Sequence, residues 1–237
     1  MSYSAHYKQT RFGHFREEGL QSYIRSTYQY MSLGLAITAA FAYVVASSPQ
    51  LAHTLLFSPM RWVVLGAPLV YMMVFARRIP YMTKDRALMH FSIYASLVGV
   101  SLSSVFFLYT SVSIVRTFLI ASGMFASTSM YGYLTKRDLT QVGSLARMAV
   151  FGIILATVIN FFFPSEKISL LVSCVGVVAF TLLTAYDTQK IKELYHYMGG
   201  NVENAPGIAV FGALTLYLDF LNLFLFLLRL LGQRRND

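Results

Sequence analysis

Residues 213–232 of the chain are ALTLYLDFLNLFLFLLRLLG, an almost unbroken apolar run. Its length matches the roughly 20 residues that an α-helix needs to cross a bilayer. The hydrocarbon core offers no water to backbone N–H and C=O groups, so the run must form a helix, whose backbone hydrogen bonds are all internal. The same run carries a carboxylate, Asp219, near its middle. That residue is the first candidate for function.

Six more apolar stretches precede this one. The chain is 56% hydrophobic and 12% charged, whereas soluble domains carry about 25% charged residues. The seven stretches are residues 28–47, 62–76, 87–109, 115–134, 145–163, 168–187 and 208–231. They lack the alternation of apolar and polar residues that is typical of membrane strands. The sequence therefore predicts an all-α, polytopic membrane protein with seven transmembrane helices, the second of them short and kinked at Pro68.

Basic residues alternate between rich and poor segments along the chain. The segment before the first stretch contains four Lys and Arg residues, and the segment after it contains one. Because cytoplasmic loops are enriched in Lys and Arg, this alternation places the N-terminus in the cytoplasm. We expect a cytoplasmic arm at residues 1–27, a seven-helix transmembrane domain at residues 28–232 and a short polar tail at residues 233–237.

The formal net charge is +9, and the basic residues lie at the ends of the apolar stretches. No nucleic-acid motif accompanies them, so we expect contact with anionic membrane lipids and none with nucleic acid. The end of the chain departs from the alternation, because seven full crossings leave Arg229, Arg234 and Arg235 on the outer side. A re-entrant last stretch would return them to the cytoplasm. We favour a full crossing, since residues 208–231 are long enough to span.

Asp219 must face the interior of a helix bundle. A carboxylate at mid-span costs about 2.5–3.5 kcal/mol on insertion scales. At about 100° per residue, Thr215, Asn222 and Arg229 fall on the same side of the helix as Asp219. The last stretch thus has one polar stripe on an otherwise apolar surface. A seventh helix placed centrally among six others would hide that stripe.

A second acid, Asp187, ends the sixth stretch in the segment TAYDTQKIKEL, with Thr184 one turn before it and Lys190 one turn after it. If Asp187 and Asp219 both face the interior, they can meet. Two carboxylates in low dielectric cannot both ionise cheaply, so the pair would share a proton and titrate as a unit. This is the basis of a pH sensor. The pairing requires a tilted or broken helix, because the two acids lie at different depths. The alternative is an interfacial Asp187 that pairs with Lys190, and an Asp219 that serves packing.

Arg77 and Arg78 end the second stretch on the side where Asp187 should lie. One of them can act as a latch on Asp187, or both can be ordinary positive-inside residues. No Ser, His and Asp occur at spacings of a catalytic triad, and His6, His14 and His53 show no metal-ligand spacing. We therefore expect no enzyme activity, no cofactor and no tight metal site.

Three segments of the chain resemble the Bax inhibitor motif family of membrane proteins, and specifically its bacterial branch. They are TAYDTQKIK at 184–192, GALTLYLDFLNLFLFLLRLLG at 212–232 and GMFASTSMYGYLTKRDL at 123–139. The resemblance implies a fold in which six helices surround a central seventh, in a bacterial inner membrane. It also implies that Asp187 and Asp219 form a paired-aspartate pH sensor, with Arg77 as the closest match to a latching arginine. Family members often carry a glutamate in the second span, which here reads WVVLGAPLVYMMVFA and has no acid.

The family is associated with pH-dependent calcium leak, with protection from cell death in eukaryotes and with modulation of a membrane-bound AAA protease in bacteria. Our first hypothesis is a pH-sensitive cation leak channel whose partners are protons and calcium ions. Calcium takes six to eight oxygens. Asp187, Asp219, Thr184, Thr215 and Asn222 offer only some of them, so we expect weak, passing contact.

Two other hypotheses remain open at this point. The chain can be a non-catalytic protein that binds and restrains another membrane protein, such as a membrane-bound AAA protease. It can also be an intramembrane aspartyl protease, since presenilin-type proteases place one aspartate on each of two neighbouring helices. Against the protease, the motif around Asp219 is LYLD instead of GxGD, and no PAL motif follows it.

Overall fold

The computed structural model describes residues 3–198 and 207–235, and side chains from residue 18 onward. In order, the elements are α1 (Tyr3–Ser47), α2 (Pro49–Leu56), α3 (Arg61–Phe75), the 3-10 helix η1 (Ile79–Tyr81), α4 (Lys84–Leu102), α5 (Val105–Leu108), α6 (Ser111–Leu134), α7 (Thr140–Phe162), α8 (Glu166–Tyr197) and α9 (Ile208–Leu231). Within the described residues, extended pairing is limited to one isolated bridge, between Tyr109 and Arg234. The predicted all-α class is confirmed.

Six of the helical segments are long and apolar enough to cross a membrane: Glu18–Ser47, Lys84–Leu108, α6, α7, α8 and α9. A seventh is obtained if α2 and α3 count as one span, although a bend of 74° separates them. The bend lies at residues 57–60, whereas we expected it at Pro68, and α3 continues through that proline. The first helix also runs on without a break across residue 28, where we placed the start of the membrane domain.

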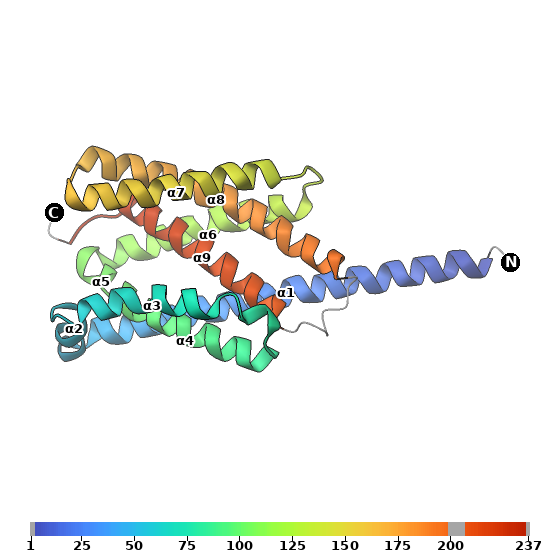
Figure 1. Cartoon of the computed structure of the whole chain (residues 1–237), viewed down its shortest axis with the longest axis horizontal. Helices are drawn as coiled ribbons and strands as arrows, with labels where there is room; N and C mark the ends of the chain where they lie inside the picture. The colour runs from blue at the N-terminus through green and yellow to red at the C-terminus, as the bar shows by residue number, and fades with distance from the viewer. Residues whose placement is uncertain (1–2, 199–206, 236–237) are drawn as a thin grey trace.

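The central position of α9 defines the architecture. One group of helices contains α1, α3 and α4, a second contains α6, α7 and α8, and α9 runs obliquely between them (Figure 1). It packs against α1, α4, α6 and α8, while α3 packs chiefly on α4 and α7 on α8. Of the apolar window of α9, 72% is buried in the bundle, against 44% for α8 and less for the other spans. The predicted central position of the last helix is confirmed.

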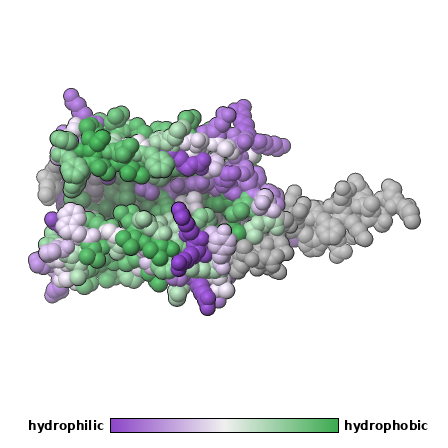
Figure 2. Space-filling model, in the orientation of Figure 1, coloured by the Kyte–Doolittle hydropathy of each residue, from purple (hydrophilic) through white to green (hydrophobic). Residues whose placement is uncertain are grey.

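The two ends of the bundle are distinguished here as proximal and distal. The proximal end holds the α6–α7 loop and the start of α9, and the distal end holds the end of α1 and the end of α9 (Figure 1). Because α9 is unbroken from Ile208 to Leu231, it runs from one end of the bundle to the other, which favours the full crossing over the re-entrant alternative. The side chains on the visible face are mostly apolar, while hydrophilic side chains gather towards the proximal end (Figure 2). This distribution suits a protein surrounded by lipid.

A buried polar link ties α9 to the first group of helices. Tyr217 of α9 is fully buried, and its hydroxyl lies 2.6 Å from Oγ1 of Thr38 on α1. The same Thr38 oxygen donates to the carbonyl of Ala95 on α4 at 3.0 Å. The ring of Tyr217 also meets the rings of Phe91 and Tyr94 edge-on. These contacts hold one face of α9 and leave its opposite face, with Asp219, towards α8.

Candidate functional site

The structure brings Asp187 of α8 and Asp219 of α9 within hydrogen-bond reach of each other. Asp219 is 4% exposed, whereas Asp187 is half-buried. Among the described residues, no N–H or O–H group donates to Oδ2 of Asp219, which is fully buried. Two ionised carboxylates only accept hydrogen bonds, so a bond between them requires a proton on one of the two.

The oblique course of α9 explains how acids at different depths meet. Asp219 is half-way along its 24-residue helix, and Asp187 lies in the proximal half of the 32-residue α8. Because α9 crosses the bundle at a slant, its middle passes beside the proximal half of α8 (Figure 1). Glycines allow close packing around this crossing. A Cβ atom on Gly132 of α6 would collide with the backbone carbonyl of Ala185 on α8.

Hydroxyl groups form a buried chain beside Asp187. Oγ1 of Thr188, the next residue, lies 2.9 Å from Oγ of Ser129 on α6. The hydroxyl of Tyr28 on α1 bonds to the same serine. Thr188 donates to the carbonyl of Thr184, and Thr184 in turn donates to the carbonyl of Phe180. Helices α1, α6 and α8 are thus linked by polar side chains at the level of the aspartate pair.

The side of the site towards α7 carries the positive charge. The guanidinium of Arg147 lies 4.8 Å above the ring of Tyr186, and its charge acts on the neighbouring Asp187. Lys190 also lies over that ring, at 5.8 Å. Gly143, one turn before Arg147, leaves room for the ring, since a Cβ there would collide with it. Tyr186 therefore docks α7 onto α8 and holds Arg147 near Asp187.

The next residue of the motif, Gln189, anchors the α6–α7 loop. Its Oε1 accepts the N–H of Leu139 at 2.9 Å, and its Nε2 donates to the carbonyl of Arg137 at 2.8 Å. In the same loop, hydrogen bonds from Thr140 lower the pKa of the exposed Asp138 carboxyl below its ordinary value. Asp138 therefore stays ionised at neutral pH, and it serves below as a control acid.

The polar stripe expected on α9 does not gather around the pair. Thr215 and Asn222 are half-buried, and they donate to the carbonyls of Phe211 and Leu218 in their own helix. Within the described helices, neither forms a hydrogen bond to an aspartate. Arg229 is exposed and lies over the ring of Phe226 at the distal end. Of the stripe, Asp219 is the residue that interacts with Asp187 on α8.

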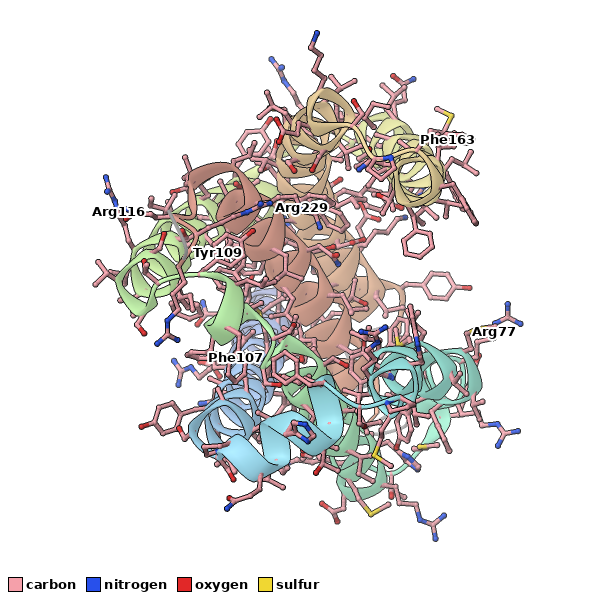
Figure 3. All side chains as sticks on the ribbon, turned by 90° about the vertical axis from the view of Figure 1, so that its left-hand side faces the viewer. Arg77, Phe107, Tyr109, Arg116, Phe163 and Arg229 are labelled. Carbon is pink, nitrogen blue, oxygen red and sulfur yellow. The ribbon has the colours of Figure 1, made fainter. Side chains whose placement is uncertain are left out.

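Arg77 and Arg78 lie at the end of α3 and are exposed. Arg77 points away from the bundle (Figure 3). Among the side chains that the structure describes, the one ion pair is between Lys190 and Glu193. A latch between Arg77 or Arg78 and Asp187 stays a prediction, and it requires an arrangement of α3 other than this one.

Sequence reasoning missed Arg147, Ser129 and Gln189. The position of Arg147 inside an apolar stretch was a signal of the same kind as that of Asp219. Nothing in the sequence distinguishes Ser129 from the other small residues of α6. Its role depends on its hydrogen bonds to residues of other helices, Thr188 and Tyr28. Gln189 was part of the quoted motif, but its two loop contacts depend on the position of α7.

Comparisons with known proteins identify the family of the chain. The sequence profile of the family described as "Inhibitor of apoptosis-promoting Bax1" matches residues 20–236. The chain belongs to the Bax inhibitor family. It is 41% identical to the inner membrane protein YbhL of Escherichia coli over 220 residues, which cover 92% of this chain and 94% of that protein. It is 41% identical to the uncharacterized protein RP147 of Rickettsia prowazekii, over 93% of both chains. An uncharacterized protein of Borreliella burgdorferi is 42% identical over 91% of this chain and 93% of its own.

Proposed function

We propose that this Bax inhibitor family member is a pH-sensitive cation leak channel for calcium, gated by the Asp187–Asp219 pair. The observation that carries the proposal is the meeting of two carboxyl groups at a buried helix interface, where Oδ2 of Asp219 has no described N–H or O–H donor. Ionisable residues placed inside a membrane bundle commonly mark ion pathways and proton relays. The pair joins the central helix to an outer one, so a change in its charge acts directly on helix packing.

The direction of the pH response follows from the shared proton. While one proton is held between the carboxyl groups, the pair is singly charged and the packing of α8 on α9 is stable. Loss of that proton places two negative charges about 4 Å apart, which costs about 4 kcal/mol at an effective dielectric constant of 20. That cost favours separation of the helices and entry of water. Raising the pH therefore opens the path, and acidification closes it.

Calcium contact at the pair is weak in this proposal. Among the described residues, no group of three or more His, Cys, Asp and Glu side chains gathers in a geometry that could hold a metal ion. Calcium takes six to eight oxygens. The two aspartates, together with backbone carbonyls and water, would supply some of them in passing, which suits permeation better than storage. A doubly ionised pair attracts a divalent cation, and a returning proton displaces it.

Arg147 tunes this equilibrium in the proposal. Its positive charge acts on Asp187 and so favours the doubly ionised pair. The guanidinium is exposed at the surface of α7, so water and salt screen its effect. Lys190 lies over the same Tyr186 ring as Arg147 and adds a second positive charge on this side of the pair.

We place the protein in a bacterial inner membrane, in line with the printed name of YbhL, with its N-terminus in the cytoplasm. This orientation puts the proximal end at the cytoplasmic surface. The alternatives are a modulator that binds a membrane protein such as an AAA protease, and, less favoured, an intramembrane aspartyl protease. Both would use the same fold without ion passage.

The deciding experiment is calcium flux into proteoliposomes that contain the purified full-length chain, measured in steps between pH 6 and 8. We expect flux that rises with pH and that follows a single transition. Flux that rises on acidification would contradict the shared-proton mechanism. A folded protein that passes no calcium at any pH would contradict the channel and leave the binding function as the better account.

A further inference from the structure

A small, partly open apolar groove lies between α1 and α6. Its volume is about 110 Å³. It is closed at its base by α9 and on one side by the α4–α5 segment. The lining residues are Leu35, Thr38, Ala39, Ala42, Leu102, Val105, Phe106, Ile114, Phe118, Phe220, Leu221 and Phe224. The two alanines of α1 and the separation of α1 from α6 create the space.

The groove offers almost no polar atom to a guest. Thr38 carries the one side-chain hydroxyl in its lining, and that oxygen is already engaged with Tyr217 and with the carbonyl of Ala95. A water molecule needs two to four polar partners, which this lining does not offer. The appropriate occupant is therefore a hydrocarbon.

The shape and position of the groove suit an acyl chain. It follows α1 from Leu35 to Ala42, which is about 10 Å at 1.5 Å per residue. Exposed apolar side chains flank it, Phe41 on α1 and Leu119 on α6. In the bilayer, the groove therefore faces lipid tails and runs along the direction in which they lie.

Two arginines stand at the distal end of this groove. The backbone N–H of Arg235 donates to the carbonyl of Leu108 at 3.1 Å, and Nη1 of Arg235 reaches the carbonyl of Phe106, a lining residue, at 3.4 Å. Arg234 pairs in the isolated bridge with Tyr109. This pairing ties the end of the chain to the α5–α6 linker, close to where the view of Figure 3 labels Tyr109. Both arginine side chains are exposed.

We propose that this groove binds a segment of one acyl chain of an anionic phospholipid, whose headgroup is held by Arg234 and Arg235. Guanidinium groups bind phosphate oxygens through paired, charge-assisted hydrogen bonds. The two parts of the site lie in the order that a phospholipid requires, with the charge at the distal surface and the apolar groove below it. The binding also gives a role to Arg234 and Arg235, two of the three arginines that the positive-inside rule does not expect at this end, the third being Arg229. It stands whether or not the protein conducts ions.

The test measures lipid retention by the purified full-length protein. The protein is loaded in mixed nanodiscs of phosphatidylglycerol and phosphatidylcholine, released into detergent, washed and weighed by native mass spectrometry. We expect one retained phospholipid, enriched in phosphatidylglycerol over the nanodisc composition. Each arginine near a membrane surface contributes about 1 kcal/mol, or roughly fivefold. Arg234→Gln with Arg235→Gln should therefore remove an enrichment of roughly 30-fold or less, while Arg61→Gln, an exposed arginine away from the groove, leaves it unchanged.

A second pair of variants tests the groove itself. Ala39→Phe fills it from an exposed position of α1, and Ala40→Phe places the same side chain on the neighbouring exposed position outside it. Retention should fall at least fivefold in Ala39→Phe and persist in Ala40→Phe, with melting temperatures close to that of the unmodified chain. Ala39→Leu replaces Ala39→Phe if the latter does not fold. Equal retention in the two variants, or retention without preference for phosphatidylglycerol, overturns the proposal.

Discussion

Asp219→Asn is the sharpest test of the proposed gate. The amide has nearly the shape of a protonated carboxyl group and keeps an N–H donor towards Asp187, but it never acquires a charge. The repulsion that opens the pair is about 4 kcal/mol for charges 4 Å apart at a dielectric constant of 20. At about 1.36 kcal/mol per factor of ten, this is a factor of up to about 1,000 in the ratio of open to closed protein. The Asp219→Asn variant should lose this entire pH-dependent change in the ratio of open to closed protein.

The assay is calcium-dependent fluorescence inside proteoliposomes, at matched protein content, between pH 6 and 8. We expect flux through the unmodified protein to rise at least about tenfold across this range, well within the electrostatic limit above. Flux through Asp219→Asn should stay at the low value of the acidic end at every pH. Asp187→Asn should behave in the same way, because either substitution leaves a single charge.

The matched control is Asp138→Asn, which removes an acid from the exposed α6–α7 loop. Since hydrogen bonds from Thr140 lower the pKa of Asp138, this carboxyl is ionised throughout the assay and contributes no transition there. Its substitution should preserve the pH profile. An Asp219→Asn protein that is folded and keeps the full profile would refute the shared-proton reasoning.

Three further expectations concern the surroundings of the pair. Arg147→Gln should move the midpoint of the flux profile to higher pH by less than about one unit, since a screened surface charge contributes little; a midpoint moved to lower pH would contradict the role given to this arginine. Gly132→Ala should lower stability by about 1–3 kcal/mol through overpacking on α8, seen as a lower melting temperature in detergent, while Gly123→Ala on the same helix, with open space around it, should not. Tyr217→Phe should cost about 1 kcal/mol by removing its hydrogen bond to Thr38, and an unchanged melting temperature would mean that this link does not hold α9.

The helical class and six of the seven predicted spans were predictable because both follow from local chemistry. A run of apolar residues about 20 long has one stable backbone conformation in a bilayer, and seven such runs are visible in the sequence. The boundaries were less predictable. The first helix begins well before residue 28, and polar residues there do not interrupt it, since Leu20 and Tyr23 are buried against the bundle. The bend of the second span lies at residues 57–60 and not at Pro68. A non-helical break between two helices allows a larger change of direction than a proline inside a continuous helix.

The candidate site also has a part that the sequence predicts and a part that it does not. Asp187 and Asp219 stand out in the sequence, since an acid inside an apolar stretch is costly unless the fold shelters it. Their partners do not stand out. Thr215 and Asn222 share a helix face with Asp219, yet they donate to backbone carbonyls of their own helix. Arg147 looks in the sequence like any other basic residue near the end of a span, but in the structure its charge acts on Asp187. Which side chains meet depends on how neighbouring helices cross.

The sequence by itself determined the membrane environment, the helical class and the two acids that cannot face lipid, because these depend only on the polarity and spacing of residues along one chain. The tertiary structure decided that α9 slants through the centre of the bundle. It also decided that the two carboxyl groups meet despite their different depths, and that Arg147 lies close to Asp187. It also decided where α1 and α6 leave a groove. Packing between helices sets these features, and it depends on the shapes of side chains far apart in the sequence, such as the absent Cβ of Gly132 against the carbonyl of Ala185.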